Sequence, residues 1–128
     1  MILLDTYTLI GIAAEPARLS PTARAMIEAP DSRLFVSAIS AWEVYVAVQK
    51  GRLLLSLPAR AWVERALSEY VISVADVTLD IALLAGELPT HHADPADRII
   101  VATAALYDFV LLTPDRNIHK YSQAKVVW

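Results

Sequence analysis

Cysteine is absent from the 128-residue chain, and glycine occurs only three times. Without a thiol the chain cannot form disulfides, bind zinc or an iron–sulfur cluster through sulfur, or use a cysteine nucleophile. The glycines form neither a phosphate-binding loop nor a dinucleotide-binding motif, and no serine lies in a nucleophile elbow. These absences exclude thiol chemistry and argue against nucleotide-cofactor and serine-hydrolase sites.

Long apolar runs are also missing. Although 56% of the residues are hydrophobic, no run approaches the roughly 18 residues that cross a bilayer, and Asp5 lies too near the start for a signal peptide. We therefore expect a cytoplasmic protein without a membrane partner. No linker or repeat interrupts residues 1–128, and a chain of this size buries a core without cross-links, so we expect a single domain.

Positive charge is scarce, because 11 lysines and arginines are outnumbered by 14 aspartates and glutamates, which gives a net charge of −3. A broad basic surface that holds nucleic acid by counterion release is therefore not expected. A nucleic-acid partner would need another source of attraction.

Short, β-branched-rich apolar runs alternate with segments of helical periodicity. The runs predict strands buried on both faces of a parallel sheet, at residues 2–4, 34–36, 71–74, 109–112 and 126–128. The periodic segments predict helices near residues 7–14, 20–30, 38–50, 58–69, 78–87 and 95–106, with Ser20, Thr78 and Asp94 as N-caps. This alternation predicts a three-layer α/β fold, in which ligands bind beyond the carboxyl ends of the strands.

Two aspartates directly follow predicted strands. Asp5 comes after residues 2–4 and Asp115 comes after residues 109–112, so both fall at the sheet edge where ligands bind. Taken alone, Asp5 is equally suited to cap the next helix, and Asp115 to occupy a turn.

Glu43 lies on an apolar helical stripe. It shares the stripe with Ile39 and Val46 and has no basic residue three or four positions further on. A carboxylate in such a place is costly unless a partner neutralises it. The alternative is a capping box with Ser40, but a helix that begins at Ser37 is equally plausible.

Asp94 and Asp97 occupy the N-cap and N3 positions of the last predicted helix, where both complement the helix dipole. Asp97 also shares an inward-facing stripe with Ile100, Val101 and Ala104. The capping role alone explains Asp94, whereas Asp97 needs a further partner.

Together these five acids can converge on one crevice, where their mutual repulsion requires cations. Oxygen ligands favour a hard divalent ion, Mg²⁺ or Mn²⁺, and such sites carry out phosphoryl chemistry by activating water and neutralising charge on the phosphate. Removing these five negative charges changes the net charge from −3 to +2. The charge argument against a nucleic-acid substrate therefore weakens once metal is bound.

The remaining chemistry-bearing residues have structural interpretations. His91 and His92 lack a third histidine, so we expect surface or capping roles rather than metal ligation. Trp42, Trp62 and Trp128 are expected to anchor the core and interfaces rather than to stack on bases.

Several motifs resemble PIN-domain proteins of the VapC toxin type, and the resemblance runs along the whole chain. Its most specific parts are the segments at residues 37–44 and 92–98. The matching residues are Leu4-Asp5-Thr6, Ser37-Ala38-Ile39-Ser40-Ala41-Trp42-Glu43-Val44, Gly51-Arg52-Leu53, Leu88-Pro89, His92-Ala93-Asp94-Pro95-Ala96-Asp97-Arg98, Leu112-Thr113-Pro114-Asp115 and Val126-Val127-Trp128.

The resemblance implies a PIN-like three-layer α/β/α fold with a short, mainly parallel sheet. It further implies a Mg²⁺- or Mn²⁺-dependent endoribonuclease that acts on RNA, forms a homodimer, and is a toxin held inactive by an antitoxin protein. By motif position, the metal-binding catalytic acids would be Asp5, Glu43, Asp97 and Asp115, with Asp94 as an additional metal-binding acid. The resemblance also implies that Thr6, Ser37 and Thr113 support these acids by hydrogen bonding. Arg98 would orient a carboxylate or contact a phosphate, unless it is a surface helix residue.

Two positions depart from the family pattern. Where relatives commonly have histidine and lysine, this chain has Tyr7 and Ala47. We expect these departures to alter substrate contacts. We also expect Lys50, which lies one turn after Ala47 on the same predicted helix, to substitute in part for the lysine of the relatives. Two alternatives stay open: a PIN nuclease that acts in RNA processing or on single-stranded DNA outside a toxin pair, and a non-catalytic module whose acidic pocket docks a basic peptide.

Overall fold

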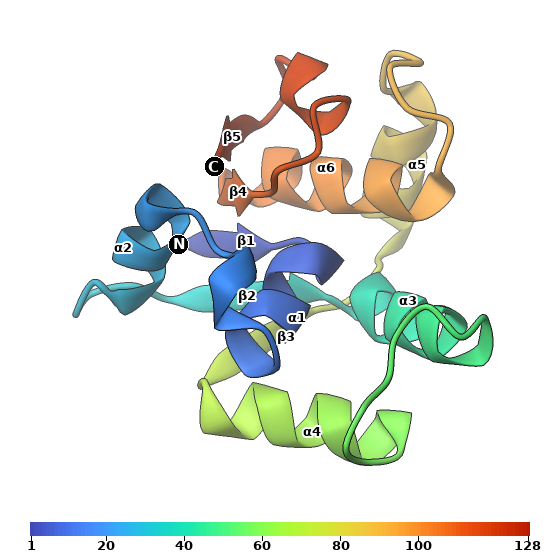
Figure 1. The fold of residues 1–128 in the computed structure, drawn as a ribbon. Coiled ribbons are helices and arrows are strands. Elements are labelled where there is room, and N and C mark those ends of the chain that lie inside the picture. The colour runs from blue at the N-terminus through green and yellow to red at the C-terminus, as the bar shows by residue number, and fades with distance from the viewer.

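Five parallel strands form one sheet in the computed structural model, which describes residues 1–128 (Figure 1). The strand order is β3-β2-β1-β4-β5, and each neighbouring pair is parallel. All carboxyl ends therefore meet at one edge of the sheet. The strands are β1 (Ile2–Leu4), β2 (Leu34–Ser37), β3 (Ile72–Ala75), β4 (Val110–Leu112) and β5 (Lys125–Val127).

Six α-helices connect the strands, close to the positions predicted from the sequence. They are α1 (Thr6–Ala13), α2 (Pro21–Glu28), α3 (Ala38–Gln49), α4 (Ala59–Glu69), α5 (Leu79–Glu87) and α6 (Pro95–Tyr107). The predicted N-caps Ser20, Thr78 and Asp94 each accept a hydrogen bond from a backbone N–H two or three residues further on. Two 3₁₀ turns, η1 (Pro16–Arg18) and η2 (Ile118–Lys120), were not predicted, because such short segments carry no hydrophobic period.

The strands distribute their apolar side chains between two core layers. Ile2 and Leu4 pack with the cluster that contains Trp62 of α4, whereas Leu3 packs on the opposite face with Ile100 of α6. Accordingly, α4 and the pair α5 and α6 lie on opposite sides of the sheet (Figure 1). The predicted three-layer α/β/α fold is confirmed. No helix is long and apolar enough to cross a bilayer.

The order of the strands fixes where a site can form. From β1 the chain proceeds to β2 and β3 on one side, and only later reaches β4 and β5 on the other. The neighbouring strands β1 and β4 therefore send their following segments in different directions, which opens a crevice at their carboxyl ends. Helix α3 starts directly after β2 at this same edge, and Figure 1 shows the start of α6 on this side of the sheet.

Candidate active site

An acidic hollow of about 330 Å³ lies where β1 and β4 end. Its walls are formed by Asp5, Thr6, Tyr7, Glu43, Asp97, Pro114 and Asp115. The fifth predicted acid, Asp94, lines an adjoining cleft that shares Thr6 and Glu43 with this hollow. The fold thus brings together acids that are more than one hundred positions apart in the chain, from Asp5 to Asp115.

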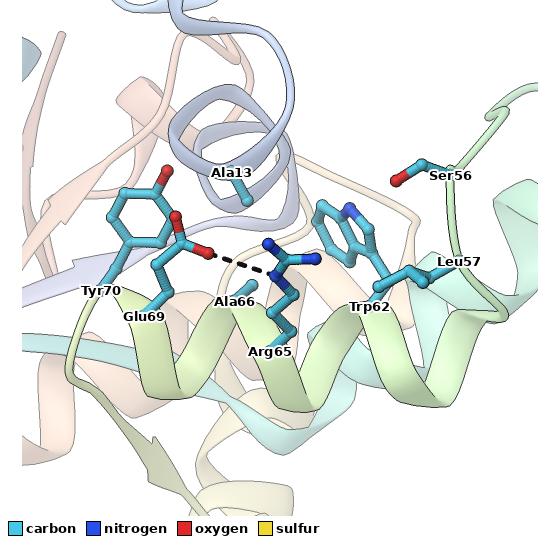
Figure 2. Close-up of a pocket in the computed structure, with 8 residues that line it drawn as sticks. All are labelled: Ala13, Ser56, Leu57, Trp62, Arg65, Ala66, Glu69 and Tyr70. Atoms are coloured by element: carbon cyan, nitrogen blue, oxygen red, sulfur yellow. Dashed lines mark ion pairs between the residues drawn. The ribbon is translucent and has the colours of Figure 1, made fainter.

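A second hollow, between α1 and α4, has a different character (Figure 2). It measures about 210 Å³, and its single acid, Glu69, pairs with Arg65 at 3.5 Å. Apolar side chains such as Trp62 and Leu57 form much of its wall. Because its charges are already paired, this hollow offers no unsatisfied group for chemistry.

Asp5 is fixed by the start of α1. Its Oδ1 accepts a hydrogen bond from the Thr8 backbone N–H at 2.7 Å, so the residue caps the helix while its side chain enters the acidic hollow. Burial raises the pKa of Asp5, and the negative charge of Asp115 adds to the effect, while hydrogen bonds from Thr113 and Thr8 partly offset it. The capping role and the site role therefore coexist in one side chain.

Glu43 is held by α1 rather than by its own helix. Thr6 Oγ1 donates to Glu43 Oε1 at 2.6 Å and also lies 2.9 Å from Ser40 Oγ. Burial raises the pKa of Glu43, as do the charges of Asp94 and Asp5, and the Thr6 hydrogen bond partly lowers it. The alternative of a capping box at Ser40 is wrong, because α3 begins at Ala38 with Ser37 as its N-cap and contains Ser40 within its first turn.

Asp94 and Asp97 both project from the start of α6. Asp94 Oδ1 accepts from the Ala96 backbone N–H at 2.9 Å, as its predicted N-cap role requires. Burial raises the pKa of Asp97 to about 7, and the charges of Glu43, Asp94 and Asp115 add to this effect against the opposing effect of His92. At neutral pH the metal-free site therefore resists full ionisation.

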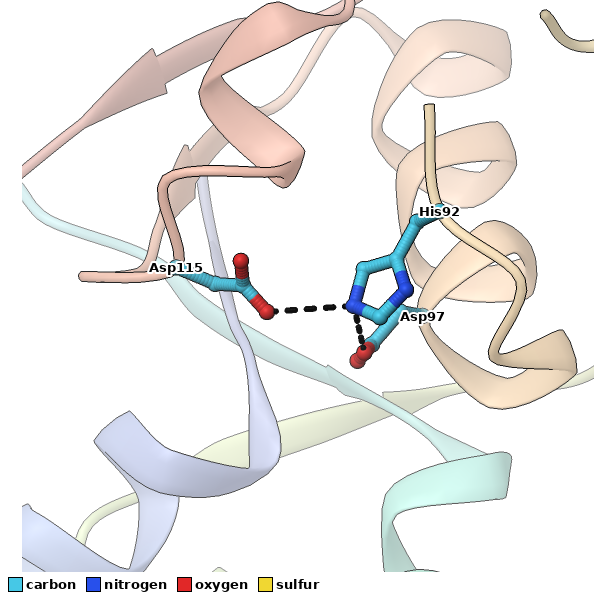
Figure 3. Close-up of side chains that lie close together, drawn as sticks. All are labelled: His92, Asp97 and Asp115. Carbon is cyan, nitrogen blue, oxygen red and sulfur yellow. Dashed lines mark hydrogen bonds and ion pairs between the residues drawn. The ribbon is translucent and has the colours of Figure 1, made fainter. Parts of the chain in front are cut away.

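His92 lies between two of these acids, contrary to the expected surface or capping role (Figure 3). Its Nε2 is 2.8 Å from Asp97 Oδ2 and 3.2 Å from Asp115 Oδ2, and its side chain is only 19% exposed. Nδ1 accepts from the Asp94 backbone N–H at 3.3 Å, so a neutral ring carries its proton on Nε2 and donates it toward the two carboxylates. His92 thereby links the segment after β4 to α6.

The sequence contained a signal for this histidine. It lies two positions before the N-cap Asp94, inside the segment 92–98 that carries the family resemblance. Its backbone N–H donates to the hydroxyl of the buried Tyr121 at 3.1 Å, which helps to hold the loop in place. Hydrophobic periodicity gives no direction for a loop side chain, so this geometry could not be inferred from pattern alone.

Arg98 contacts none of the five acids, which corrects the expectation that it orients a carboxylate. Its guanidinium instead donates to backbone carbonyls, with Nη2 2.7 Å from Ala85 O and 2.9 Å from Leu88 O, and Nη1 3.0 Å from Pro89 O. These acceptors lie at the end of α5 and in the loop that leads to His92. Arg98 therefore fixes this loop and pairs with no carboxylate.

Ser37 and Thr113 differ in their relation to the acids. Ser37 Oγ accepts from the Ile39 backbone N–H at 3.2 Å and caps α3, and it bonds to none of the five acids. The Thr113 hydroxyl accepts from the Asp115 backbone N–H at 3.1 Å and also lowers the pKa of Asp5 by hydrogen bonding. Thr113 thus supports the cluster directly, whereas Ser37 supports only the helix that carries Glu43.

The donor atoms of the cluster fit a divalent cation. Two groups, His92 with Asp97 and Asp115, and Glu43 with Asp94 and Asp97, each bring their ligand atoms within 4.8 Å of one another. Asp97 belongs to both groups, and most donors are carboxylate oxygens, which hard cations prefer. Burial and the negative charges of neighbouring acids raise the pKa values of Glu43 and Asp97, and a bound cation would oppose this effect.

Comparisons with known proteins agree with this geometry. The PIN domain family model matches residues 2–124. The chain is 37% identical over 130 positions to Ribonuclease VapC22 from Mycobacterium tuberculosis, with 99% of this chain and 98% of that protein covered.

Solved structures match over similar spans. VapBC2 from Rickettsia felis, bound to a DNA fragment from its promoter, gives a TM-score of 0.73 at 16% identity and covers 99% of this chain and 98% of that one. A toxin–antitoxin complex from Klebsiella pneumoniae gives a TM-score of 0.69 at 24% identity, over 100% of this chain and 97% of that one. At these identities the two structures establish the fold.

The single parallel sheet between two helical layers is thus that of a PIN domain, and the chain belongs to the PIN-domain family. The end-to-end similarity to a VapC ribonuclease confirms the resemblance to VapC-type members that the motifs indicated.

We predict that the metal-free protein becomes less stable, relative to an Asp97→Asn variant, as the pH rises from about 4 to about 7. The folded protein retains a proton on Asp97 up to about pH 7, whereas the unfolded chain releases it near the ordinary aspartate pKa of 3.8. The unfolded state binds fewer protons in this interval, so the free energy of unfolding falls with pH. Thermal unfolding of both proteins in EDTA measures the difference, and a constant difference across the interval would contradict the assignment.

For Arg98→Lys we predict a loss of about 1–3 kcal/mol in the free energy of unfolding, because a lysine cannot reproduce the forked contacts to several carbonyls. Urea unfolding measures the loss, and amide exchange should become faster in the loop before α6. Arg60→Lys is the matched control, since Arg60 is 79% exposed and pairs only with Glu64, and its effect should stay within about 0.5 kcal/mol. Equal effects of the two substitutions would contradict the role given to Arg98.

Proposed function

We propose that the protein is a metal-dependent endoribonuclease that hydrolyses RNA phosphodiester bonds, with residues 1–128 acting as one catalytic domain. The observation that carries this proposal is the convergence of Asp5, Glu43, Asp97 and Asp115 on one hollow at the switch point of the sheet. The similarity to Ribonuclease VapC22 supports the choice of RNA as substrate.

The residues that would hold Mg²⁺ or Mn²⁺ are Asp5, Asp94, Asp97 and Asp115, with Glu43 beside them. When bound, the ion lowers the pKa of an attacking water and neutralises charge that develops on the phosphate. The chain's own contribution is positioning, because caps at α1 and α6 fix Asp5 and Asp94 before any ligand arrives.

Thr6 and His92 restrict the side-chain orientations of three acids. Because Thr6 binds Glu43 through Oε1, the other oxygen of Glu43 remains available for a ligand. His92 draws Asp97 and Asp115 toward one another from two separate elements. These hydrogen bonds reduce the reorganisation that binding would otherwise require.

We further propose that the enzyme is the toxin of a toxin–antitoxin pair. Solved structures with this fold include VapBC2 and a toxin–antitoxin complex. An arginine from a C-terminal segment of the antitoxin would be the natural inhibitory contact, because a guanidinium pairs with two carboxylate oxygens at once. The acidic hollow would offer that contact when RNA is excluded.

A homodimer is the proposed assembly. Large exposed apolar side chains gather on β3, on α5 and the segment before it, and at the end of α6. They are Val74, Val77, Leu79, Leu83, Leu106 and Tyr107. Exposed apolar side chains of this kind are typical of a protein interface, and none of these six lines the acidic hollow.

The proposed activity is tested by incubating purified protein with total cellular RNA in Mg²⁺, Mn²⁺ or EDTA. We predict cleavage with either metal, none in EDTA, and a loss of roughly a hundredfold or more in Asp97→Asn, because a metal-binding carboxylate is removed. Asp31→Asn is the matched control, since Asp31 is an exposed acid outside the hollow. Cleavage that persists in EDTA, or that both variants lose equally, would contradict the proposal.

A further inference from the structure

A cleft of about 360 Å³ opens from the acidic hollow and shares Thr6 and Glu43 with it. We call it the α3 cleft, because most of its other walls come from α3 and the turn after it. Those walls are Trp42, Val46, Ala47, Lys50, Arg52 and Asp94. The small side chain of Ala47 leaves space along the helix between the acids and the two cations.

The two cations of the α3 cleft are unpaired. Lys50 and Arg52 are exposed, and their side chains form neither an ion pair nor a hydrogen bond. Most other arginines do have partners, which are acids for Arg18, Arg24, Arg60 and Arg65, and carbonyls for Arg98. Two free cations beside an acidic site are available to bind an anion.

Trp42 is the exposed aromatic residue of this cleft. Trp42 is 59% exposed, unlike Trp62, which is 7% exposed in the core, so Trp42 does not anchor the core. No aromatic ring or cation covers it, whereas Tyr7 in the acidic hollow already contacts the Trp128 ring at 6.0 Å and the Arg18 guanidinium at 4.6 Å. The indole of Trp42 is therefore free to stack on a planar ligand.

We infer that the α3 cleft binds the nucleotide next to the scissile phosphate of single-stranded RNA, with its base on Trp42 and its phosphate on Lys50 and Arg52. This inference rests on the proposed function. An aromatic platform beside cations suits a single strand, whose bases are unstacked, rather than a duplex.

The helix geometry supports this arrangement. Lys50 follows Glu43 by seven residues, which corresponds to about 10 Å along α3. The acids that would act on one phosphate are thus separated from the cations that would bind another, and the cleft lies between them. The two free cations favour RNA over a protein segment as the occupant.

The test is binding of a short fluorescein-labelled single-stranded RNA of mixed sequence, measured by anisotropy in Ca²⁺, which fills oxygen sites with less exacting geometry than Mg²⁺. We predict that Trp42→Ala weakens binding roughly tenfold, whereas Trp42→Tyr, which keeps a stacking surface, stays within about threefold of the wild type. Tyr45→Ala, which removes an exposed aromatic from the same helix but outside the cleft, should bind as the wild type. Thermal unfolding checks that each variant is folded.

The cations give a second, independent readout. Each phosphate that is neutralised on a single strand contributes about 0.7 to the salt dependence of binding, so removing both cations from this one phosphate, in Lys50→Ala with Arg52→Ala, should reduce the slope of log K against log salt by about 0.7. Arg33→Ala removes the same kind of charge outside the cleft and should leave the slope unchanged.

The outcomes separate this inference from the proposed function. RNA binding that depends on Trp42 but leads to no cleavage would contradict the proposed nuclease activity and support RNA binding by the α3 cleft. Unchanged RNA binding and cleavage in Trp42→Ala would contradict RNA binding by the α3 cleft but not the proposed nuclease activity. Loss of only dimerisation or antitoxin binding in Trp42→Ala would have the same meaning. RNA binding by the wild type that is too weak to measure would also overturn the inference.

Discussion

Electrostatic repulsion among carboxyl groups at one sheet edge is the constraint on which the rest of the site depends. The acids cannot separate, because the backbone fixes them: Asp5 accepts from Thr8 N–H, and Asp115 Oδ1 accepts from the Asn117 N–H at 2.8 Å. Since burial also deprives these groups of water, the pKa values of Asp5, Glu43 and Asp97 are raised. The folded chain therefore holds its acids in mutual repulsion, and a bound divalent ion would reduce that repulsion.

The parallel sheet is what makes this arrangement possible. Its strands bury apolar side chains on both faces, and Leu3 and Leu111 are fully buried between the layers. Hydrophobic burial in the two core layers stabilises the fold against the repulsion at its edge. In addition, Thr6 and His92 donate hydrogen bonds into the cluster, so three of its acids gain a neutral partner without the entry of a basic side chain.

Much of this geometry could be predicted from the sequence, because it follows from the positions of acids relative to apolar elements. Asp5 and Asp115 follow buried runs, and the stripe that Asp97 shares with Ile100 and Val101 turns its side chain toward the acidic hollow. Parallel pairing then brings such residues to one edge. The acids were therefore predictable as a set even though each had a simpler local explanation.

The side-chain positions that could not be predicted are those that depend on the path of a loop. His92 points between Asp97 and Asp115 only because the loop before α6 is anchored by Arg98 and by the Tyr121 hydroxyl. Neither anchor has a periodic signal, so the direction of the imidazole and the target of the guanidinium were both missed. The exposure of Trp42 could not be predicted for a related reason, since hydrophobicity alone does not say which flank of α3 stays uncovered.

The most direct test of the central claim is proton release on Mg²⁺ binding, measured by titration calorimetry in two buffers that differ in ionisation enthalpy. Because burial and neighbouring charges raise the pKa of Asp97 to about 7, metal binding should displace more protons at about pH 6 than at about pH 8. Binding that releases no protons at either pH, or no binding of Mg²⁺ at all, would contradict the account.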